Sequence, residues 1–278
     1  MKNIDTYYVL GNPVAHSQSP WIHSRFAELT GQTLRYDKRH VELDGFKPAV
    51  DALIAEGALG CNITVPFKFE AAALAERLSE RAALAQAVNV LSFTPDGILG
   101  DNSDGVGLAN DIQGNAGFAI AGRRVLLLGA GGAAAGVLGP LIAEKPAHIT
   151  VANRTLERAE DLVTRHTVLA LLHKTELTAQ QMQGLEADFD LIVNATASSL
   201  KGEALALDRV RLAPGALAYD MMYGTKAQPF LAWASTQGAV VRDGLGMLVE
   251  QAGVAFTLWR GVVAPTAQVL AELRTRVA

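Results

Sequence analysis

The sequence contains little cysteine, few aromatic residues and no strong excess of either charge. Cys61 is the only cysteine among the 278 residues, which excludes a small fold held together by disulfides. The formal net charge is -4 and no block of lysine or arginine occurs, so the sequence predicts no nucleic-acid partner. Hydrophobic residues make up 50% of the chain, which excludes a disordered protein.

A hydrophobic run long enough to span a membrane is also missing. The closest approach, Val125 to Ala143, runs 19 residues without a charge, near the ~20 that a bilayer needs. Glycines and Pro140 interrupt it, and Val125–Leu128 is typical of a buried strand, so we predict no membrane segment. No apolar region follows the first residues, which predicts a soluble cytoplasmic protein without a secretory signal.

Apolar segments typical of strands alternate with helical patterns along the chain. In the first part the expected strands are Tyr7–Leu10, Leu34–Val41, Gly60–Val65 and Val88–Phe93. In the second part they are Val125–Leu128, Ile149–Ala152, Val168–Leu171, Leu191–Ala195, Leu217–Asp220 and Ala239–Val241. Alternating βα units predict a parallel sheet with helices on both faces. We therefore expect an α/β protein of two domains, with a boundary near residues 104–107.

Two helix starts carry residues that favour capping. Ser19 followed by Pro20 predicts an N-cap and a first helical residue, and Gly31 ends that helix. Asp44 is the expected cap of the next helix. The segment from Met247 to Ala278 is also predicted to be helical, but its periodicity does not indicate where it packs.

A glycine loop follows the predicted strand Val125–Leu128. Gly129-Ala130-Gly131-Gly132-Ala133-Ala134 matches the pattern G-x-G-x-x-A. The first glycine permits a tight turn, the second lets the backbone approach a pyrophosphate, and the small last residue lets helix and strand pack closely. An anion would then bind the free N–H groups at the helix start. The alternative is a plain turn in an Ala-rich chain, but the flanking strand and helix favour dinucleotide binding.

The next predicted strand ends in Asn153-Arg154-Thr155, and Arg158 follows one turn later. An NAD site usually carries an acidic residue there, whereas two guanidinium groups favour the 2′-phosphate of NADP. The alternative is that Arg158 is a solvated surface charge that pairs with Glu157 or Asp161.

Lys68 follows the predicted strand Gly60–Val65, at the strand end where α/β proteins place their sites. Partial burial against Phe67 would favour the neutral amine and suit the lysine to acid–base catalysis. Asp104 offers a carboxylate that could orient it. Taken alone, Lys68 fits equally well as a surface lysine, and Asp104 as a turn residue.

Other polar side chains are suited to recognise a hydroxylated carboxylate, namely Ser17, Ser19, Thr64 and Asn89. Each of them also has an interpretation as a cap, turn or strand residue. The six histidines show no ligand-like spacing with Cys61 or with one another, so we predict no metal site.

Taken together, these motifs resemble the shikimate dehydrogenase family over nearly the whole chain. The resemblance is carried by residues 11–20 (GNPVAHSQSP), 62–68 (NITVPFK), 87–89 (AVN), 100–105 (GDNSDG), the Gly129 loop, 153–155 (NRT), 194–196 (NAT), 219–221 (YDM) and 243–249 (DGLGMLV). Their order and number make a chance agreement implausible.

The resemblance implies a reversible, NADPH-linked reduction of 3-dehydroshikimate to shikimate, in the pathway to chorismate and the aromatic amino acids. It implies an N-terminal α/β substrate domain, residues 1–105, completed by C-terminal helices of residues 245–278. Residues 106–244 would form a Rossmann-like NADP domain. The partners would be small molecules, and the enzyme a monomer or a homodimer.

The resemblance also assigns individual residues. Lys68 would be the acid–base group and Asp104 its partner. The substrate-binding residues would be Ser17, Ser19, Asn62, Thr64, Lys68, Asn89, Asp104, Tyr223 and Gln251. The cofactor-binding residues would be Glu80, Gly129, Ala130, Gly131, Gly132, Ala133, Asn153, Arg154, Thr155, Arg158, Thr196, Met221 and Gly244.

The sequence departs from the family pattern at a few loop positions. Ser103 stands where threonine is frequent, Gln86 stands where glycine is common, and Ala197 and Ser199 replace the usual serine and glycine. Two alternatives stay open. One is a quinate/shikimate dehydrogenase with relaxed NAD(P) use, against which the two arginines argue. The other is a catalytically silent NADP-binding regulator, against which the presence of both Lys68 and Asp104 argues.

Overall fold

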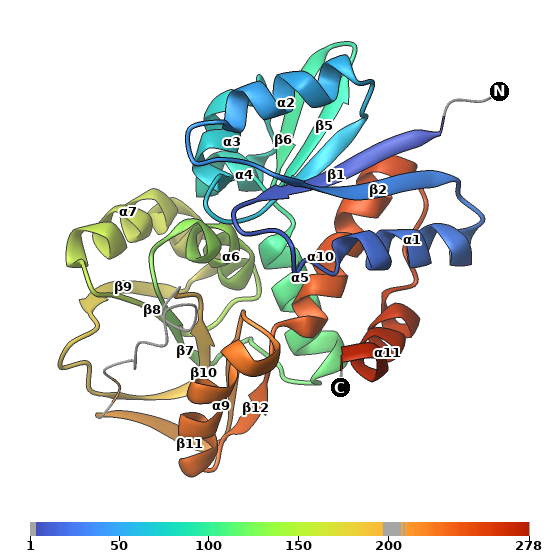
Figure 1. Cartoon of the computed structure of the whole chain (residues 1–278). Coiled ribbons are helices and arrows are strands. Elements are labelled where there is room, and N and C mark those ends of the chain that lie inside the picture. The colour runs from blue at the N-terminus through green and yellow to red at the C-terminus, as the bar shows by residue number, and fades with distance from the viewer. Residues whose placement is uncertain (1–3, 197–206, 208, 278) are drawn as a thin grey trace. The chain divides into compact units, whose positions relative to one another are not determined.

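Strands and helices alternate along the chain, and the predicted α/β fold class is confirmed. The computed structural model describes residues 4–196, 207 and 209–277, and the chain divides into two units (Figure 1). One unit contains the chain up to Gly107 and again from Val249, and the other contains residues 108–248. The chain passes between the units within α5 (Asp104–Asn110) and within α10 (Leu245–Arg260).

The first unit is built on a six-stranded mixed sheet in the order β2-β1-β3-β5-β6-β4. Its strands are β1 (Asp5–Gly11), β2 (Leu34–His40), β3 (Gly60–Ile63), β4 (Arg77–Leu78), β5 (Val90–Thr94) and β6 (Gly97–Asp101). Strand β1 pairs in parallel with β2 and β3, whereas β5 runs antiparallel to both β3 and β6. The helices of this unit are α1 (Ser19–Thr30), α2 (Phe46–Ala55), α3 (Lys68–Leu74), α4 (Glu80–Ala85) and α11 (Thr266–Val277), besides its parts of α5 and α10.

Both faces of this sheet are covered, because β1 is apolar on both sides. Alternate residues of a strand point to opposite faces. Leu10 packs with Phe46, Val50 and other buried residues of α2, α3 and α4, whereas Tyr7 stacks on Trp259 of α10 with ring centroids 4.6 Å apart. Figure 1 shows α2 and α3 on one side of the sheet and α1 and α10 on the other.

The second unit has an all-parallel sheet in the order β12-β11-β10-β7-β8-β9. Its strands are β7 (Arg124–Leu128), β8 (His148–Asn153), β9 (Glu176–Gln181), β10 (Ala187–Asn194), β11 (Val210–Asp220) and β12 (Val240–Arg242). Helices α6 (Gly132–Ala143) and α7 (Leu156–His173) lie on one side of the sheet and α9 (Gln228–Thr236) on the other (Figure 1). A 3-10 turn, η2 (Gly224–Lys226), precedes α9.

A buried carboxylate holds one end of the second unit. Asp111 begins the π-helical turn η1 (Asp111–Asn115) and is fully buried. Both of its oxygens accept hydrogen bonds from Arg242 at 2.6 and 2.7 Å, and the hydroxyl of Tyr219 donates to it at 2.7 Å. A methyl group added at Gly246 would overlap the Asp111 carboxylate, so glycine is required at that close approach.

Three local predictions are wrong. Residues 168–171 form no strand but lie inside α7, whose buried residues Ala159, Leu162, His166 and Ala170 recur at helical spacing. The strand lies later, in the polar edge strand β9. Ser19 is the first residue of α1, and the N-cap of that helix is Gln18. The N-cap of α2 is Gly45 and not Asp44. Neither N-cap residue makes a side-chain capping bond.

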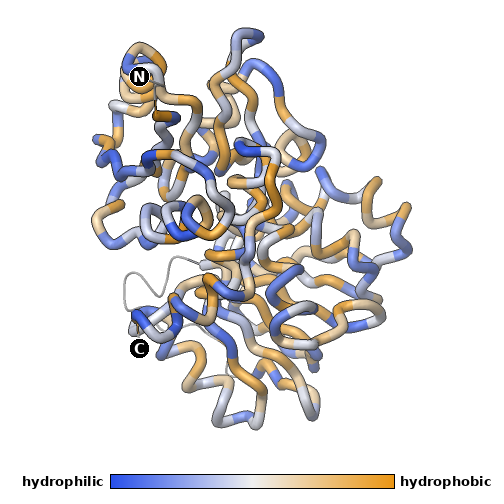
Figure 2. The backbone as a smooth tube through the Cα atoms, turned by 90° about the vertical axis from the view of Figure 1, so that its right-hand side faces the viewer, coloured by the Kyte–Doolittle hydropathy of each residue, from blue (hydrophilic) through white to orange (hydrophobic). Residues whose placement is uncertain are grey.

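Hydrophobic and hydrophilic segments alternate along the coloured part of the tube in Figure 2. Within residues 4–196, 207 and 209–277, no helix combines the length and the hydropathy that a bilayer-spanning segment needs.

Candidate active site

Lys68 is placed by a buried strand and a buried aromatic residue. All four residues of β3 are buried, and Phe67, in the turn after that strand, packs its ring on that of Phe46 with centroids 5.2 Å apart. Lys68 comes next, as the first residue of α3. Its side chain is only 13% exposed, so its ammonium group depends on protein partners rather than on bulk water.

The partner is the carboxylate of Asp104, whose side chain is 7% exposed. One oxygen of Asp104 accepts a hydrogen bond from Lys68 Nζ, and the other accepts one from Asn89 Nδ2 at 2.8 Å. The two charges therefore form a mostly buried ion pair, and the neutral amide of Asn89 holds its carboxylate. Ion pairs of this kind stabilise little by themselves, but breaking one leaves an uncompensated charge.

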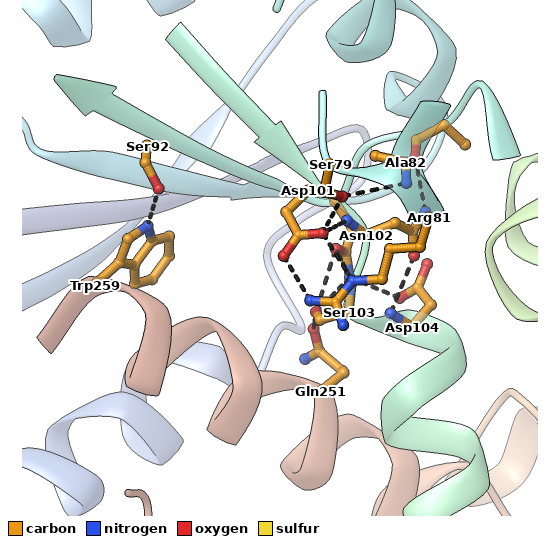
Figure 3. A network of polar contacts seen from close by, with 12 residues as sticks. Ser79, Arg81, Ala82, Ser92, Asp101, Asn102, Ser103, Asp104, Gln251 and Trp259 are labelled. Atoms are coloured by element: carbon orange, nitrogen blue, oxygen red, sulfur yellow. Dashed lines mark hydrogen bonds and ion pairs between the residues drawn. The ribbon is translucent and has the colours of Figure 1, made fainter. Parts of the chain in front are cut away.

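Asn89 connects this pair to a second group of polar side chains. Its Nδ2 also lies 3.0 Å from Ser103 Oγ and 3.3 Å from Gln251 Oε1, and its Oδ1 accepts from the Ser103 backbone at 2.8 Å. Figure 3 shows Ser103, Asp104 and Gln251 gathered where β6, α5 and α10 approach one another. Gln251 is 162 residues away from Asn89 in sequence, so only the folded first unit brings these groups together.

The two predicted serines are also close to each other. Ser17 Oγ donates to Ser19 Oγ at 3.1 Å, and Ser19 is buried. Asn62 is also buried, and it accepts a hydrogen bond from Tyr36 Oη at 2.7 Å and donates to the Asn89 carbonyl at 3.1 Å. Thr64 is half-buried in the loop after β3, and its methyl group fills the space that a side chain at Gly11 would need.

The glycine loop of the second unit has the conformation that its sequence indicates. Gly129 has φ +107°, in the left-handed region, and an added methyl group would lie 3.1 Å from the carbonyl oxygen of Ala195. Gly131 is extended and precedes α6, and no side chain caps that helix start. The first N–H groups of α6 therefore lack a side-chain capping acceptor and fit the pyrophosphate of a dinucleotide.

The predicted phosphate-binding residues lie at the C-terminal end of β8. Arg154, Thr155 and Arg158 are exposed, and Thr155 is the N-cap residue of α7 without a side-chain capping bond. Asn153 Nδ2 donates to the carbonyl of Thr155 at 2.8 Å and so braces this turn. These two exposed guanidinium groups and the hydroxyl follow β8, the strand that pairs with β7. They fit a 2′-phosphate.

The remaining predicted cofactor residues follow β10, β11 and β12. Thr196 donates through its hydroxyl to Asn194 Oδ1 at 2.7 Å, and the Met221 N–H donates to the Asn194 carbonyl at 3.0 Å. Gly244 lies against the backbone of Met221, where an added methyl group would overlap the Met221 carbonyl. Ala197 and Ser199 lie outside the described residues.

Two predicted residues belong to a different unit from the other residues predicted for the same ligand. Glu80 is exposed at the start of α4 in the first unit, whereas the other predicted cofactor residues belong to the second. Tyr223 belongs to the second unit, whereas the other predicted substrate residues belong to the first. Burial raises the pKa of the Tyr223 hydroxyl, which favours its protonated form as a hydrogen-bond donor.

The structure also shows polar residues that the sequence analysis did not assign. Tyr36 positions Asn62, and Arg81 forms an ion pair with Asp101 next to the Asp104 segment. A lone aromatic residue in the charged strand β2 was the available signal for Tyr36. Gln86 caps the C-terminus of α4 with φ +52°, in the left-handed region that favours glycine. Among the described residues, no cluster of three His, Cys, Asp or Glu side chains could hold a metal ion.

Three family models match the chain. Residues 9–91 match the shikimate dehydrogenase substrate binding domain, residues 108–202 match shikimate / quinate 5-dehydrogenase, and residues 244–274 match the shikimate 5′-dehydrogenase C-terminal domain. A curated relative, shikimate dehydrogenase (NADP(+)) of Acidovorax sp. (strain JS42), is 61% identical over 274 residues, which cover 99% of this chain and 97% of the relative.

Solved structures are also similar over nearly the whole chain. Shikimate 5-dehydrogenase from Thermus thermophilus, in complex with NADP(H) and shikimate, is 26% identical with a TM-score of 0.83, covering 98% of this chain and 99% of that one. An Ael1 enzyme from Pseudomonas putida is 41% identical with a TM-score of 0.84, covering 97% of this chain and 98% of that one.

Proposed function

The chain belongs to the shikimate dehydrogenase family and is an NADP-dependent oxidoreductase that interconverts 3-dehydroshikimate and shikimate, and from this premise we propose that Lys68 and Asp104 perform the proton transfer. The observation that supports the proposal is their ion pair, which is mostly buried and lies at the C-terminal end of β3. It also makes a silent NADP-binding regulator the poorer explanation, because such a protein has no need of the pair.

Lys68 acts on the oxygen of the reacting carbon. Bound NADPH supplies the hydride that reduces the ketone. Negative charge then develops on the ketone oxygen, and Lys68 donates a proton to it. In the reverse direction the neutral amine of Lys68 accepts the hydroxyl proton of shikimate. Because this interaction is strongest in the transition state, its loss lowers kcat more than it weakens binding.

Asp104 and Asn89 hold Lys68 in place for this step. Asp104 divides its oxygens between Lys68 and Asn89, so the carboxylate cannot rotate without losing a hydrogen bond. A fixed carboxylate keeps Nζ at one position, which is the condition for an efficient proton transfer. We assign Asp104 a second role as an acceptor for a substrate hydroxyl.

The remaining polar groups of the first unit hold the substrate. Ser17 and Ser19 are assigned to the carboxylate of shikimate, because two adjacent hydroxyls can donate to one anion. The ring hydroxyls are assigned to Asn62, Thr64, Asn89, Gln251 and, from the second unit, Tyr223. Supporting this, the first four belong to the same unit as Lys68 and Asp104, and Asn62, Asn89 and Gln251 are buried.

The second unit binds NADP. The glycine loop and the start of α6 are assigned to the pyrophosphate, and Asn153, Arg154, Thr155 and Arg158 to the adenosine 2′-phosphate. Thr196, Met221 and Gly244 are assigned to the nicotinamide end, and Glu80 of the first unit is also assigned to the cofactor. We accordingly propose residues 1–105 with 245–278 as the substrate domain and 106–244 as the NADP domain.

The catalytic assignment is tested with Lys68→Met and Asp104→Asn. We expect kcat for shikimate oxidation to fall roughly a hundredfold to ten-thousandfold, with little change in the Kd for NADP+. Lys47→Met is a matched control, since Lys47 forms an exposed pair with Asp51 in the same unit. A near-normal kcat in Lys68→Met would show that the assignment is wrong.

Relaxed specificity is the second candidate, favoured by the match to a family model that includes quinate 5-dehydrogenase. Initial rates with shikimate or quinate, each with NADP+ or NAD+, decide between the two. We expect turnover to be dominated by shikimate with NADP+. Comparable rates with quinate or NAD+ would favour the relaxed enzyme.

We place the enzyme in the cytoplasm, where NADPH-linked biosynthetic reductions draw on a shared cofactor pool, and in the pathway to chorismate. We expect a monomer or a homodimer. Light scattering of the purified protein distinguishes these two states, and a larger assembly would contradict both.

A further inference from the structure

Asp101 lies three residues before Asp104 and is the most heavily hydrogen-bonded carboxylate around the site. Its oxygens accept from Arg81 Nε at 2.8 Å, Arg81 Nη2 at 2.5 Å, Ser79 Oγ at 2.5 Å and the Asn102 N–H at 2.7 Å. Figure 3 shows these donors converging on Asp101. The Asp101 side chain is 12% exposed and that of Arg81 34%, so this is a partly enclosed, two-pronged ion pair.

Asp101 is connected to Asp104 by hydrogen bonds that run through Asn102 and Asn89. The side chain of Asn102 donates to the Ala87 carbonyl at 2.8 Å, and its oxygen accepts from the Asp104 N–H at 3.1 Å. The Asp101 carbonyl accepts from the Asn89 N–H at 3.0 Å, and Asn89 in turn donates to the Asp104 carboxylate. The turn 101–104 is therefore fixed at its start by Arg81 and at its end by Asn89.

The pair also balances charge. Burial acts to raise the pKa of the Asp101 carboxyl, but hydrogen bonds from Arg81 and Ser79 outweigh it and hold the pKa below its ordinary value. Asp101 is thus ionised and matched by Arg81, just as Asp104 is matched by Lys68. Without Arg81, the turn that carries Asp104 would hold a second carboxylate that no cation matches.

We propose that Arg81 and Asp101 are positioning residues, whose ion pair fixes the turn 101–104 so that Asp104 presents one oxygen to Lys68 and the other to Asn89. The proposal rests on the proposed catalytic role of Lys68 and Asp104. It assigns Arg81 no contact with substrate or cofactor.

The test uses Arg81→Gln, Arg81→Lys and Asp101→Asn in the full-length enzyme. We expect Arg81→Gln to lower kcat for shikimate oxidation roughly ten- to hundredfold, as for a displaced catalytic group, with an unchanged KM for NADP+. Arg81→Lys keeps the charge without the planar fork and should recover part of the loss. All rates are measured well below the Tm of each variant.

The pH profile separates positioning from a merely structural role. An unmatched Asp101 favours the protonated amine of Lys68, so Arg81→Gln should move the acid limb of the kcat profile to higher pH. Asp101→Asn leaves Arg81 unmatched and should move it to lower pH. Arg25→Gln is the matched control, because Arg25 makes a similar two-pronged pair with Glu272 on the same unit. It should lower Tm without changing either kcat or the profile.

Two outcomes would overturn the proposal. One is a wild-type kcat and pH profile in Arg81→Gln with only a lowered Tm, which would match Arg25→Gln. The other is a profile shift in the same direction for both charge removals. If Arg81→Gln does not fold, Asp101→Asn still tests the proposal, because a wild-type kcat and pH profile in that variant would overturn it. Normal turnover of Lys68→Met would instead contradict the catalytic assignment itself.

Discussion

We expect His23 to make the first unit sensitive to mild acid, and its replacement by leucine to reduce that sensitivity. The imidazole is fully buried on α1 and stacks on Tyr36, with ring centroids 4.2 Å apart. Phe26, Phe256 and Trp259 surround it, and neither ring nitrogen makes a hydrogen bond of ordinary geometry, although Asn62 lies near enough to oppose part of the effect of burial. Burial lowers the pKa of His23 from 6.5 to about 3.

The sign follows from proton binding. Below pH 6.5 the unfolded chain takes up a proton at His23 that the folded chain does not, so acid favours unfolding. Stability is fully present above pH 6.5 and is lost progressively between that pH and about 3. At ~1.4 kcal/mol per pH unit, the free energy of unfolding falls by about 2 kcal/mol near pH 5 and by roughly 5 kcal/mol near pH 3 from this group alone.

The assay is urea unfolding at a series of pH values for the wild type, His23→Leu and His16→Leu. His16 is exposed, so its variant controls for the removal of a histidine. Near pH 7 we expect His23→Leu to lie within about 1.5 kcal/mol of the wild type, because leucine has a similar volume and no unpaired nitrogens. Near pH 5 the wild type should have lost about 2 kcal/mol relative to the variant.

Parallel stability curves for wild type and His23→Leu between pH 7 and pH 4 would refute this reasoning. They would mean that the imidazole gains a proton as easily inside the fold as outside it. His166, in the second unit, is a second buried histidine with a pKa lowered to about 4 by burial. Some acid sensitivity should therefore persist in His23→Leu, and the double replacement should remove more.

Further outcomes follow from other buried groups. Gly246→Ala should lower the free energy of unfolding by about 3–5 kcal/mol in denaturant titrations, because the added methyl group displaces the paired Asp111. Gly114 faces open space, so Gly114→Ala should change this free energy by less than about 1 kcal/mol. Burial raises the pKa of the Cys61 thiol, so a thiol reagent should label it only after unfolding, and rapid labelling of the native enzyme would contradict that burial. Because the pKa of Asp101 lies below its ordinary 3.8, Asp101→Asn should cost stability at neutral pH, and the difference from wild type should shrink as the pH falls below 3.8.

Much of the candidate site could be predicted because its residues lie in short contiguous motifs. The glycine loop depends on a local conformation, φ +107° at Gly129, that few residues other than glycine adopt. The glycines in the sequence therefore predict the loop. Lys68 follows the apolar strand segment 60–65, and Asp104 lies in the polar segment 100–105. The order of these segments along the chain is distinctive. Arg154 and Arg158, which follow β8, are proposed for the 2′-phosphate because a missing acidic residue is itself a signal.

Other features could not be predicted, because they depend on partners distant in sequence. The polar edge strand β9 has no clear apolar pattern. It forms because it pairs in parallel with β8 along its whole length. The exposed Val168 and Leu171 mimic a strand in sequence but are the outward face of a helix. The pairing of Arg81 with Asp101 joins α4 to the end of β6, 20 residues later.

The sequence by itself predicted the class of fold, the glycine loop and the proposed catalytic pair, because each is a local pattern of residue types and spacing. Only the tertiary structure decided what surrounds that pair. Asn89 meets Gln251 across 162 residues, and Arg81 meets Asp101, because burial brings polar groups together and each must find a partner once water is excluded.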